Sequence, residues 1–172
     1  MGAPVVATGP DDDPDRAFPH VEAESIRRTT WPSFAWLTQS APSPRQALAP
    51  PLERARVALV GTAGAYGPGQ PRFSLGAAGD HSYRELPADA TGLRFSHPGF
   101  DTRLAYRDPD VAYPLALLRD FEREGRIGSL ASRAFSFMGY IPEPDPLVDE
   151  TAPEVANALA ADGVDLVLLV PV

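Results

Sequence analysis

The stretch "DGVDLVLLVPV", residues 162–172, decides the fold class of this chain. Its apolar residues follow one another almost without interruption: Val164, Leu166, Val167, Leu168, Leu169 and Val170. A run of this kind predicts a strand that is buried on both faces of a parallel sheet. In such sheets, ligands gather on the loops beyond the carboxyl ends of the strands. The sequence therefore stops where an active-site loop is expected.

Upstream of this run, apolar segments alternate between strand and helix patterns. The predicted elements are a strand with a Gly turn over 56–64, a short strand within 81–87, a second parallel strand over 93–101, a helix after Asp108, a third parallel strand over 134–141, and a helix over 149–163. The first helix has Val111, Leu115, Leu118 and Phe121 at helical spacing and Gly125 past its end. Thr151 is the predicted N-cap of the second helix, and Gly163 is its stop.

This alternation predicts an α/β fold with a mainly parallel sheet and flanking helices, doubly wound in the Rossmann-like manner. We expect the sheet to lack its C-terminal part, because no helix follows the last strand to cover its other face. Residues 1–50 are predicted to be a flexible arm and a Pro-rich linker, with a short helix or cap within 21–40. Residues 51–172 form the predicted domain.

Composition excludes several classes of function. The net charge of −8 disfavours nucleic acid and anionic membrane surfaces as partners. The absence of Cys removes disulfides and thiol nucleophiles from the given residues, and the absence of Lys removes a P-loop lysine. No apolar run reaches membrane-spanning length, and the first residues lack a signal-peptide pattern, so we expect a cytoplasmic protein.

Candidate site residues follow two of the predicted strands. Thr62, Ala63 and Gly64 form the turn after the first strand and are predicted to line a ligand. His97 and Asp101 lie just beyond the second predicted strand, where an imidazole and a carboxylate could share a proton or orient one another. We predict no metal among these residues.

Two other interpretations of these residues stay open. The Gly-rich stretch 61–69 could expose backbone N–H groups to a phosphate, although it matches neither GxxxxGK[ST] nor GxGxxG. A metal-dependent hydrolase could use His81 and His97, although their spacing is not diagnostic of a zinc site.

Several stretches together resemble the selenoprotein B family of glycine/sarcosine/betaine/D-proline reductases. They are "RVALVGTAG", "FSHPGFD", "GRIGSLASRAFSFMGYI" and "ETAPEVANALAADGVDLVLLVPV", and the resemblance covers roughly residues 52–172. It implies an oxidoreductase that cleaves a carbon–nitrogen bond reductively with a dithiol/disulfide couple. The implied partners are a small amino-acid-like substrate, a dithiol or thioredoxin-type reductant and other reductase subunits.

In that family the attacking group is a selenocysteine, or a Cys in its place, directly after the strand that resembles "DLVLLVPV". The resemblance therefore implies no catalytic residue within the given sequence and a selenocysteine immediately downstream of Val172. We expect the codon after Val172 to be UGA, which ordinary gene prediction treats as a stop. The alternative is a non-catalytic α/β binding or subunit-interaction module, if the chain ends at Val172.

Overall fold

The computed structural model describes residues 24–29, 32 and 46–172. The chain divides into two compact units, Met1–Gln46 and Ala47–Val172. In the first unit, residues 24–29 are helical, as expected for part of 21–40, and Arg28 forms an ion pair with Glu24 at 2.9 Å. The predictions of a flexible arm over 1–20 and of most of the Pro-rich linker lie outside the described residues.

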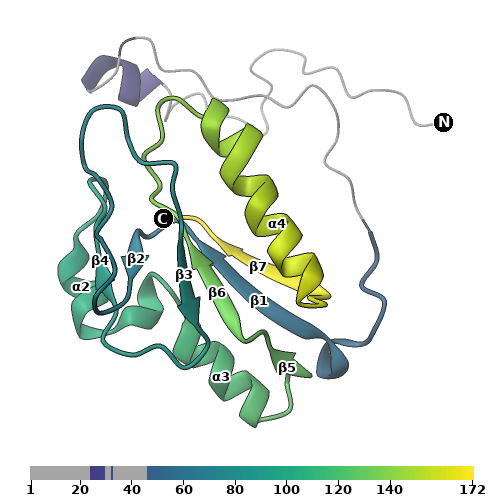
Figure 1. Cartoon of the computed structure of the whole chain (residues 1–172). Helices are drawn as coiled ribbons and strands as arrows, with labels where there is room; N and C mark the ends of the chain where they lie inside the picture. The colour runs from purple at the N-terminus through teal and green to yellow at the C-terminus, as the bar shows by residue number, and fades with distance from the viewer. Residues whose placement is uncertain (1–23, 30–31, 33–45) are drawn as a thin grey trace, which may run out of the picture. The chain divides into compact units, whose positions relative to one another are not determined.

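The second unit contains a mixed, mostly parallel sheet (Figure 1). Its strands are β1 (Arg56–Gly61), β3 (Arg84–Pro87), β5 (Ser129–Leu130), β6 (Arg133–Ser136) and β7 (Leu166–Val170). Strand β1 pairs in parallel with β5, β6 and β7, and β3 pairs antiparallel with β6. The predicted strands over 56–64, within 81–87 and over 134–141 are therefore confirmed in this sheet.

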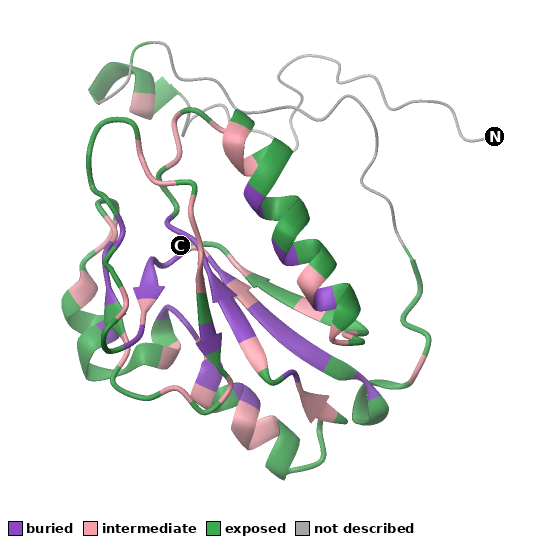
Figure 2. Cartoon of the chain, in the orientation of Figure 1, coloured by how far each residue is buried: buried purple, intermediate pink, exposed green. Residues whose placement is uncertain are grey.

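Helices cover both faces of β1. On one face, Val57 and Leu59 share a buried cluster with Leu115 and Leu118 of α3 (Leu115–Arg123). On the other face, Ala58 and Phe135 pack with Val155 and Leu159 of α4 (Ala152–Ala161). Figure 2 shows this burial concentrated on β1 and β6. The remaining helical segments are η1 (Leu52–Arg54), α2 (Thr102–Arg107), η2 (Pro109–Val111) and η3 (Leu147–Thr151).

Strand β7 exists where it was predicted, but it is not buried on both faces. It pairs with β1 alone, and within the described part of the chain no strand pairs with its outer edge. Val167 packs into the α4-side core, whereas 68% of Leu169 and 38% each of Leu166 and Leu168 are exposed. The predicted burial of this strand on both faces is thus wrong. An apolar run indicates a strand but does not reveal whether one strand or two pair with it.

The predicted second parallel strand over 93–101 is also wrong. Only Arg94–Phe95 is extended, as β4, and it pairs antiparallel with β2 (Ala65–Tyr66) in a separate two-stranded sheet. Gly64 explains this arrangement: its φ is +64°, and a Cβ there would lie 2.1 Å from the Ser96 carbonyl oxygen. The chain after β1 therefore turns toward residues 94–96 and pairs with them outside the main sheet.

Both predicted helices differ from the structure at their amino-terminal ends. Asp108 caps the short η2 through a bond from Asp110 N, and Pro114 begins a new helix, so that Val111 is 61% exposed. Thr151 lies at the N-cap position of α4, as predicted, but its hydroxyl donates to the His81 carbonyl at 2.8 Å and makes no capping bond. The stops at Gly125 and Gly163 are confirmed by φ values of +69° and +66°.

The fold is therefore α/β, as predicted, but the doubly wound Rossmann-like arrangement is not confirmed. One strand of the main sheet is antiparallel, and a strand predicted to be parallel lies outside the sheet. No helix among the described residues is both long and apolar enough to cross a membrane.

Candidate functional site

The candidate site lies at the carboxyl ends of β1, β6 and β7, close to the C mark in Figure 1. Thr62 follows β1, and its Oγ1 accepts a hydrogen bond from Val172 N at 2.9 Å. Its own N–H donates to Val170 O at 3.0 Å. These bonds continue the ladder between β1 and β7 past the last paired residues. The end of β7 is consequently held against the turn that follows β1.

The segment after β6 closes the site from the other side of β1. Ala63 forms an isolated antiparallel bridge with Met138, and Gly64 N donates to Phe137 O at 2.8 Å. A Cβ added to Gly139 would lie 2.6 Å from His97 Nε2, 2.7 Å from Val172 O and 3.3 Å from Thr62 O. Real Cβ atoms do not approach other atoms so closely. Glycine at 139 is thus what allows these three groups to converge on one point.

His97 reaches this point from the segment after β4. Its Nδ1 accepts a hydrogen bond from Gly99 N at 2.9 Å, and its ring packs on Phe100 with centroids 5.0 Å apart. Because Nδ1 is an acceptor, the proton of the neutral ring belongs on Nε2. Nε2 is buried and forms no hydrogen bond within the described part of the chain. A buried N–H donor therefore faces the end of β7 without a partner of its own.

The surroundings of His97 favour the neutral ring. Burial lowers the pKa of His97 below its ordinary value, since a charged imidazolium loses solvation there. The Val172 main-chain oxygen opposes this shift, although its position does not satisfy the geometry of a hydrogen bond to Nε2. Near neutral pH, His97 is thus a neutral donor at Nε2.

Asp101 does not join this group. Its carboxylate caps α2 by accepting from Arg103 N at 3.0 Å, and it forms an ion pair with the Arg103 guanidinium at 2.7 Å. The hydrogen bonds from Arg103 lower the pKa of Asp101. The imidazole and carboxylate that the sequence places four residues apart are therefore engaged by different neighbours. Of the predicted residues, the structure brings together Thr62, Ala63, Gly64 and His97.

Several amides of the Gly-rich stretch 61–69 are already bonded within the fold. Gly64 N bonds to Phe137 O, Ala65 N donates to Ser136 Oγ at 2.8 Å, and Gly67 N donates to Gln70 Oε1 at 2.8 Å. These donors are used within the fold, so the phosphate interpretation gains no support. Likewise, within the described residues no three His, Cys, Asp or Glu side chains are grouped so that they could hold a metal ion.

Sequence reasoning missed the role of Gly139, which it placed inside a predicted strand. A glycine that interrupts an apolar strand pattern is a known sign of close backbone approach, and "FSFMGYI" carries that sign. Nothing in the sequence indicated which groups would approach. The resulting site has one N–H donor without a partner among the described residues, and two carbonyl oxygens around a glycine. The N–H can donate to an atom placed beside the end of β7, whereas the carbonyl oxygens can only accept.

Comparison of the sequence with known proteins identifies the family of this chain. The family model for glycine/sarcosine/betaine reductase selenoprotein B (GRDB) matches residues 40–172. The chain therefore belongs to the selenoprotein B family of glycine, sarcosine, betaine and D-proline reductases, as the sequence resemblance implied.

Among individual relatives, D-proline reductase subunit gamma of Acetoanaerobium sticklandii is 38% identical over 120 residues, which are 69% of this chain and 49% of that subunit. Glycine reductase complex component B subunit gamma of Peptoclostridium acidaminophilum is 32% identical over 123 residues, 69% of this chain and 28% of that protein. The chain thus spans about half the length of the first relative and less of the second. No solved structure matches the chain.

Proposed function

We propose that this chain forms part of a selenoprotein B-type reductase, which cleaves the carbon–nitrogen bond of glycine-, sarcosine-, betaine- or D-proline-like substrates with a dithiol/disulfide couple. Family membership supports the class of reaction, and the relatives are named as reductase subunits. The observation that carries the proposal is the buried Nε2–H of His97, which forms no hydrogen bond with the described residues and lies near the carboxyl end of β7.

We further propose that the attacking group is a selenocysteine, or a Cys, placed directly after Val172. The donor set fits such a group, because an N–H donor stabilises an anionic selenolate or thiolate more than the neutral form. A selenolate supplies a strong nucleophile that is ionised near neutral pH and can be regenerated by dithiols. In this proposal His97 donates to the anion, and Thr62 fixes the end of the strand that carries it.

Under this proposal, His97 and Gly139 have separate roles. His97 must stay neutral with its proton on Nε2, which burial and the bond from Gly99 N both favour. Gly139 must stay small, because any side chain there would occupy the space between Nε2 and the end of β7. Neither role identifies the substrate.

The nucleotide sequence after the Val172 codon tests the placement of the attacking group. The proposal expects UGA, followed by a reading frame that resembles the second half of the relatives. UAA or UAG at that position would contradict it.

A chemical test addresses His97 in the full-length protein. The rate of alkylation of the selenol or thiol by iodoacetamide, measured against pH, reports its pKa. We expect His97→Gln to raise that pKa and to slow alkylation near neutral pH, whereas His81→Gln at an exposed position leaves both unchanged. An unaltered profile in His97→Gln would remove His97 from the mechanism.

A second candidate function is a subunit-interaction module without chemistry of its own. The exposed side chains of β7 favour it, and no strand among the described residues pairs with its second edge, which could therefore offer backbone groups to another chain. The two candidates differ in the role of His97. An interaction module would tolerate His97→Gln in an assembled complex with full reductase activity, and the proposed reductase would not.

A further inference from the structure

Two segments at the carboxyl ends of the parallel strands pack on each other (Figure 1). Segment 74–82 leads into β3, whose start pairs with the end of β6, and segment 139–151 follows β6 and contains η3. A Cβ at Gly79 would lie 2.4 Å from Tyr140 O, and Thr151 donates a hydrogen bond of 2.8 Å to a carbonyl oxygen of the first segment. We call these two segments together the edge surface.

Large apolar side chains are exposed on the edge surface. The exposed fraction is 55% for Leu75, 39% for Tyr140 and 58% for Val148, and none of the three belongs to either buried cluster of the second unit. Grouped apolar side chains on a protein surface mark contacts with other molecules, because their removal from water is favourable. The edge surface therefore has the apolar content of a docking site.

The edge surface is also acidic. Exposed carboxylates occur at Glu143, Asp145, Asp149 and Glu150, and neither segment contains an Arg. None of these carboxylates forms an ion pair or a side-chain hydrogen bond within the described part of the chain. Their negative charge is therefore not neutralised by the fold.

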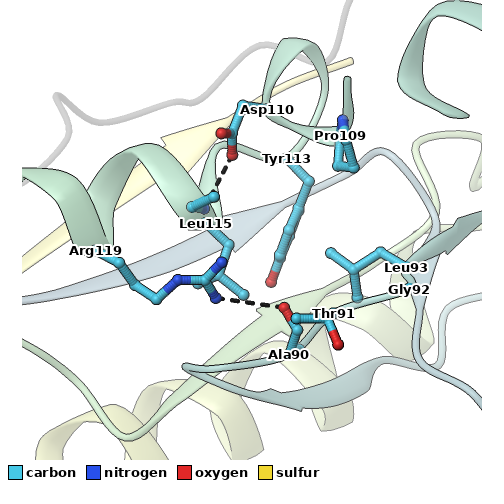
Figure 3. Close-up of a pocket in the computed structure, with 10 residues that line it drawn as sticks. Ala90, Thr91, Gly92, Leu93, Pro109, Asp110, Tyr113, Leu115 and Arg119 are labelled. Atoms are coloured by element: carbon cyan, nitrogen blue, oxygen red, sulfur yellow. Dashed lines mark hydrogen bonds between the residues drawn. The ribbon is translucent and has the colours of Figure 1, made fainter. Parts of the chain in front are cut away.

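Most carboxylates elsewhere in the second unit have partners. Those that pair with Arg side chains are Glu85, Asp101, Asp120, Glu124 and Asp162. Asp110, beside the cavity drawn in Figure 3, accepts from Ala116 N at 2.9 Å. Glu53 and Asp89 are exposed and unpaired among the described residues, but they lie at the other end of the sheet. Unpaired negative charge is thus concentrated on the edge surface.

The two properties together restrict what could bind there. Like charges on one surface repel each other, and a partner of opposite charge removes that repulsion. Anionic lipid and nucleic acid would be repelled. A metal ion does not account for the carboxylates, because no three such side chains among the described residues are grouped to hold one. A protein face with basic groups around an apolar centre complements both the charge and the exposed apolar side chains.

We propose that the edge surface docks a partner protein whose contact face carries Lys or Arg side chains around an apolar centre. The partner's apolar side chains cover Leu75, Tyr140 and Val148, and its basic groups pair with the carboxylates around them. The second segment begins at Gly139, which faces His97 Nε2, so the docked partner lies next to the candidate site. The surface consists only of residues of this chain and does not rest on the proposed reductase chemistry.

Titration of the full-length protein with peptides tests the chemistry of the partner. The probe is a short amphipathic helical peptide of Lys and Leu, and two control peptides replace every Lys by Glu or every Leu by Gln. We expect saturable binding of the Lys/Leu peptide, with amide chemical shifts centred on 74–82 and 139–151, and affinity that falls as NaCl is added. Both control peptides should bind at least about tenfold more weakly. Equal binding of either control, or shifts centred on other segments, would overturn the proposal.

A double variant tests the carboxylates. Asp149→Asn combined with Glu150→Gln removes two exposed charges with little change in shape, and we expect about tenfold weaker binding of the Lys/Leu peptide at low salt. The matched control is Glu53→Gln combined with Asp89→Asn, which removes the same charge at the other end of the sheet. Equal losses in the two double variants would mean that net charge alone explains binding, and would overturn the assignment of this surface.

A conservative variant tests the apolar centre. Val148→Thr keeps the shape of the side chain but replaces a methyl group by a hydroxyl group, so affinity for the Lys/Leu peptide should fall severalfold. Val111→Thr is the control, because Val111 is 61% exposed and lies outside the edge surface. Urea unfolding confirms that both variants fold. Wild-type affinity in Val148→Thr would contradict the proposed apolar contact.

Discussion

Thr62 Oγ1 accepts a hydrogen bond from Val172 N at 2.9 Å and so holds the end of β7 against the turn after β1. The two residues are 110 positions apart in the sequence. The same turn presents Thr62 O toward Gly139, which faces His97 Nε2. Thr62 thus meets the end of β7 through its hydroxyl and approaches Gly139 through its carbonyl oxygen.

Thr62→Val removes this acceptor while it keeps the shape of the side chain. We expect the free energy of unfolding in urea to fall by about 1 kcal/mol, the ordinary net value of one hydrogen bond. Hydrogen exchange at the Val172 amide should accelerate by more than exchange within β1. Thr62→Ser, which keeps the hydroxyl, is the control, and equal stability of the two variants would contradict the assigned bond.

Gly139→Ala places a methyl group 2.6 Å from His97 Nε2 and 2.7 Å from Val172 O. Because real Cβ atoms do not approach other atoms so closely, the His97 ring or the backbone must shift, and we expect a loss of about 1–3 kcal/mol in the free energy of unfolding. The His97 ring resonances should shift at the same time. Gly76→Ala serves as the matched control, since its nearest neighbour, Ser74 Oγ, is 3.4 Å away and the site is exposed. Wild-type stability in Gly139→Ala would show that the convergence is looser than described.

The pKa of His97 can be measured by titrating its ring resonances. Burial lowers this pKa in the folded protein below the value of about 6.5 expected for the unfolded chain. The folded state therefore binds this proton more weakly than the unfolded state does. Protonation then favours unfolding, so stability falls as pH drops through about 6.5.

The same linkage gives a test by variants. Between pH 7.5 and pH 5.5, the free energy of unfolding should fall less in His97→Gln than in the wild-type protein. His81→Gln should show the wild-type decrease, because His81 is exposed and lies outside the site. A ring pKa at or above about 6.5 would contradict the described burial.

Arg133 connects β6 to the end of α4 and to β3. Its Nε donates to Asp162 Oδ2 at 2.6 Å, and its Nη1 donates to Glu85 Oε2 at 3.0 Å. The bonds from Arg133 lower the pKa of Asp162 in the folded protein. This contribution is present above the unfolded pKa of about 3.9 and is lost as pH falls through the lower folded value.

Arg133→Gln should consequently lower the free energy of unfolding at pH 7, and the difference from wild type should disappear in strong acid. Arg72→Gln, at an exposed position, should show no such pH-dependent difference. Urea unfolding at pH 7 and at a series of pH values into strong acid, below the folded pKa of Asp162, measures both. A difference that stayed constant between these pH values would mean that packing, not the Asp162 ion pair, explains the effect.

The local elements of this fold could be predicted because their signals lie within short segments. Gly125 and Gly163 end helices through positive φ values, which glycine adopts without steric cost. The apolar runs of β1 and β7 predict strands regardless of which strands they pair with. The error at 93–101 arose because a two-residue strand has too few positions to show a pattern, and its partner is set by the turn at Gly64.

The candidate site was predicted in part for the same reason. Thr62 and His97 were recognisable as polar groups that follow apolar segments, a local property of the sequence. Asp101 was wrongly paired with His97, because the nearby Arg103 competes for its carboxylate. The contact of Gly139 with His97 joins residues on different segments, and no short window contains both.

By itself, the sequence determined that "DGVDLVLLVPV" forms a strand and that its family is that of the selenoprotein B reductases, because apolar periodicity and motif identity are written in consecutive residues. Only the tertiary structure decided that β7 pairs with β1 alone among the described strands and exposes its leucines, and that its end meets Thr62, Gly139 and His97. The reason is physical. Burial and hydrogen-bond partners depend on which segments pack together, and that is settled by the whole chain at once.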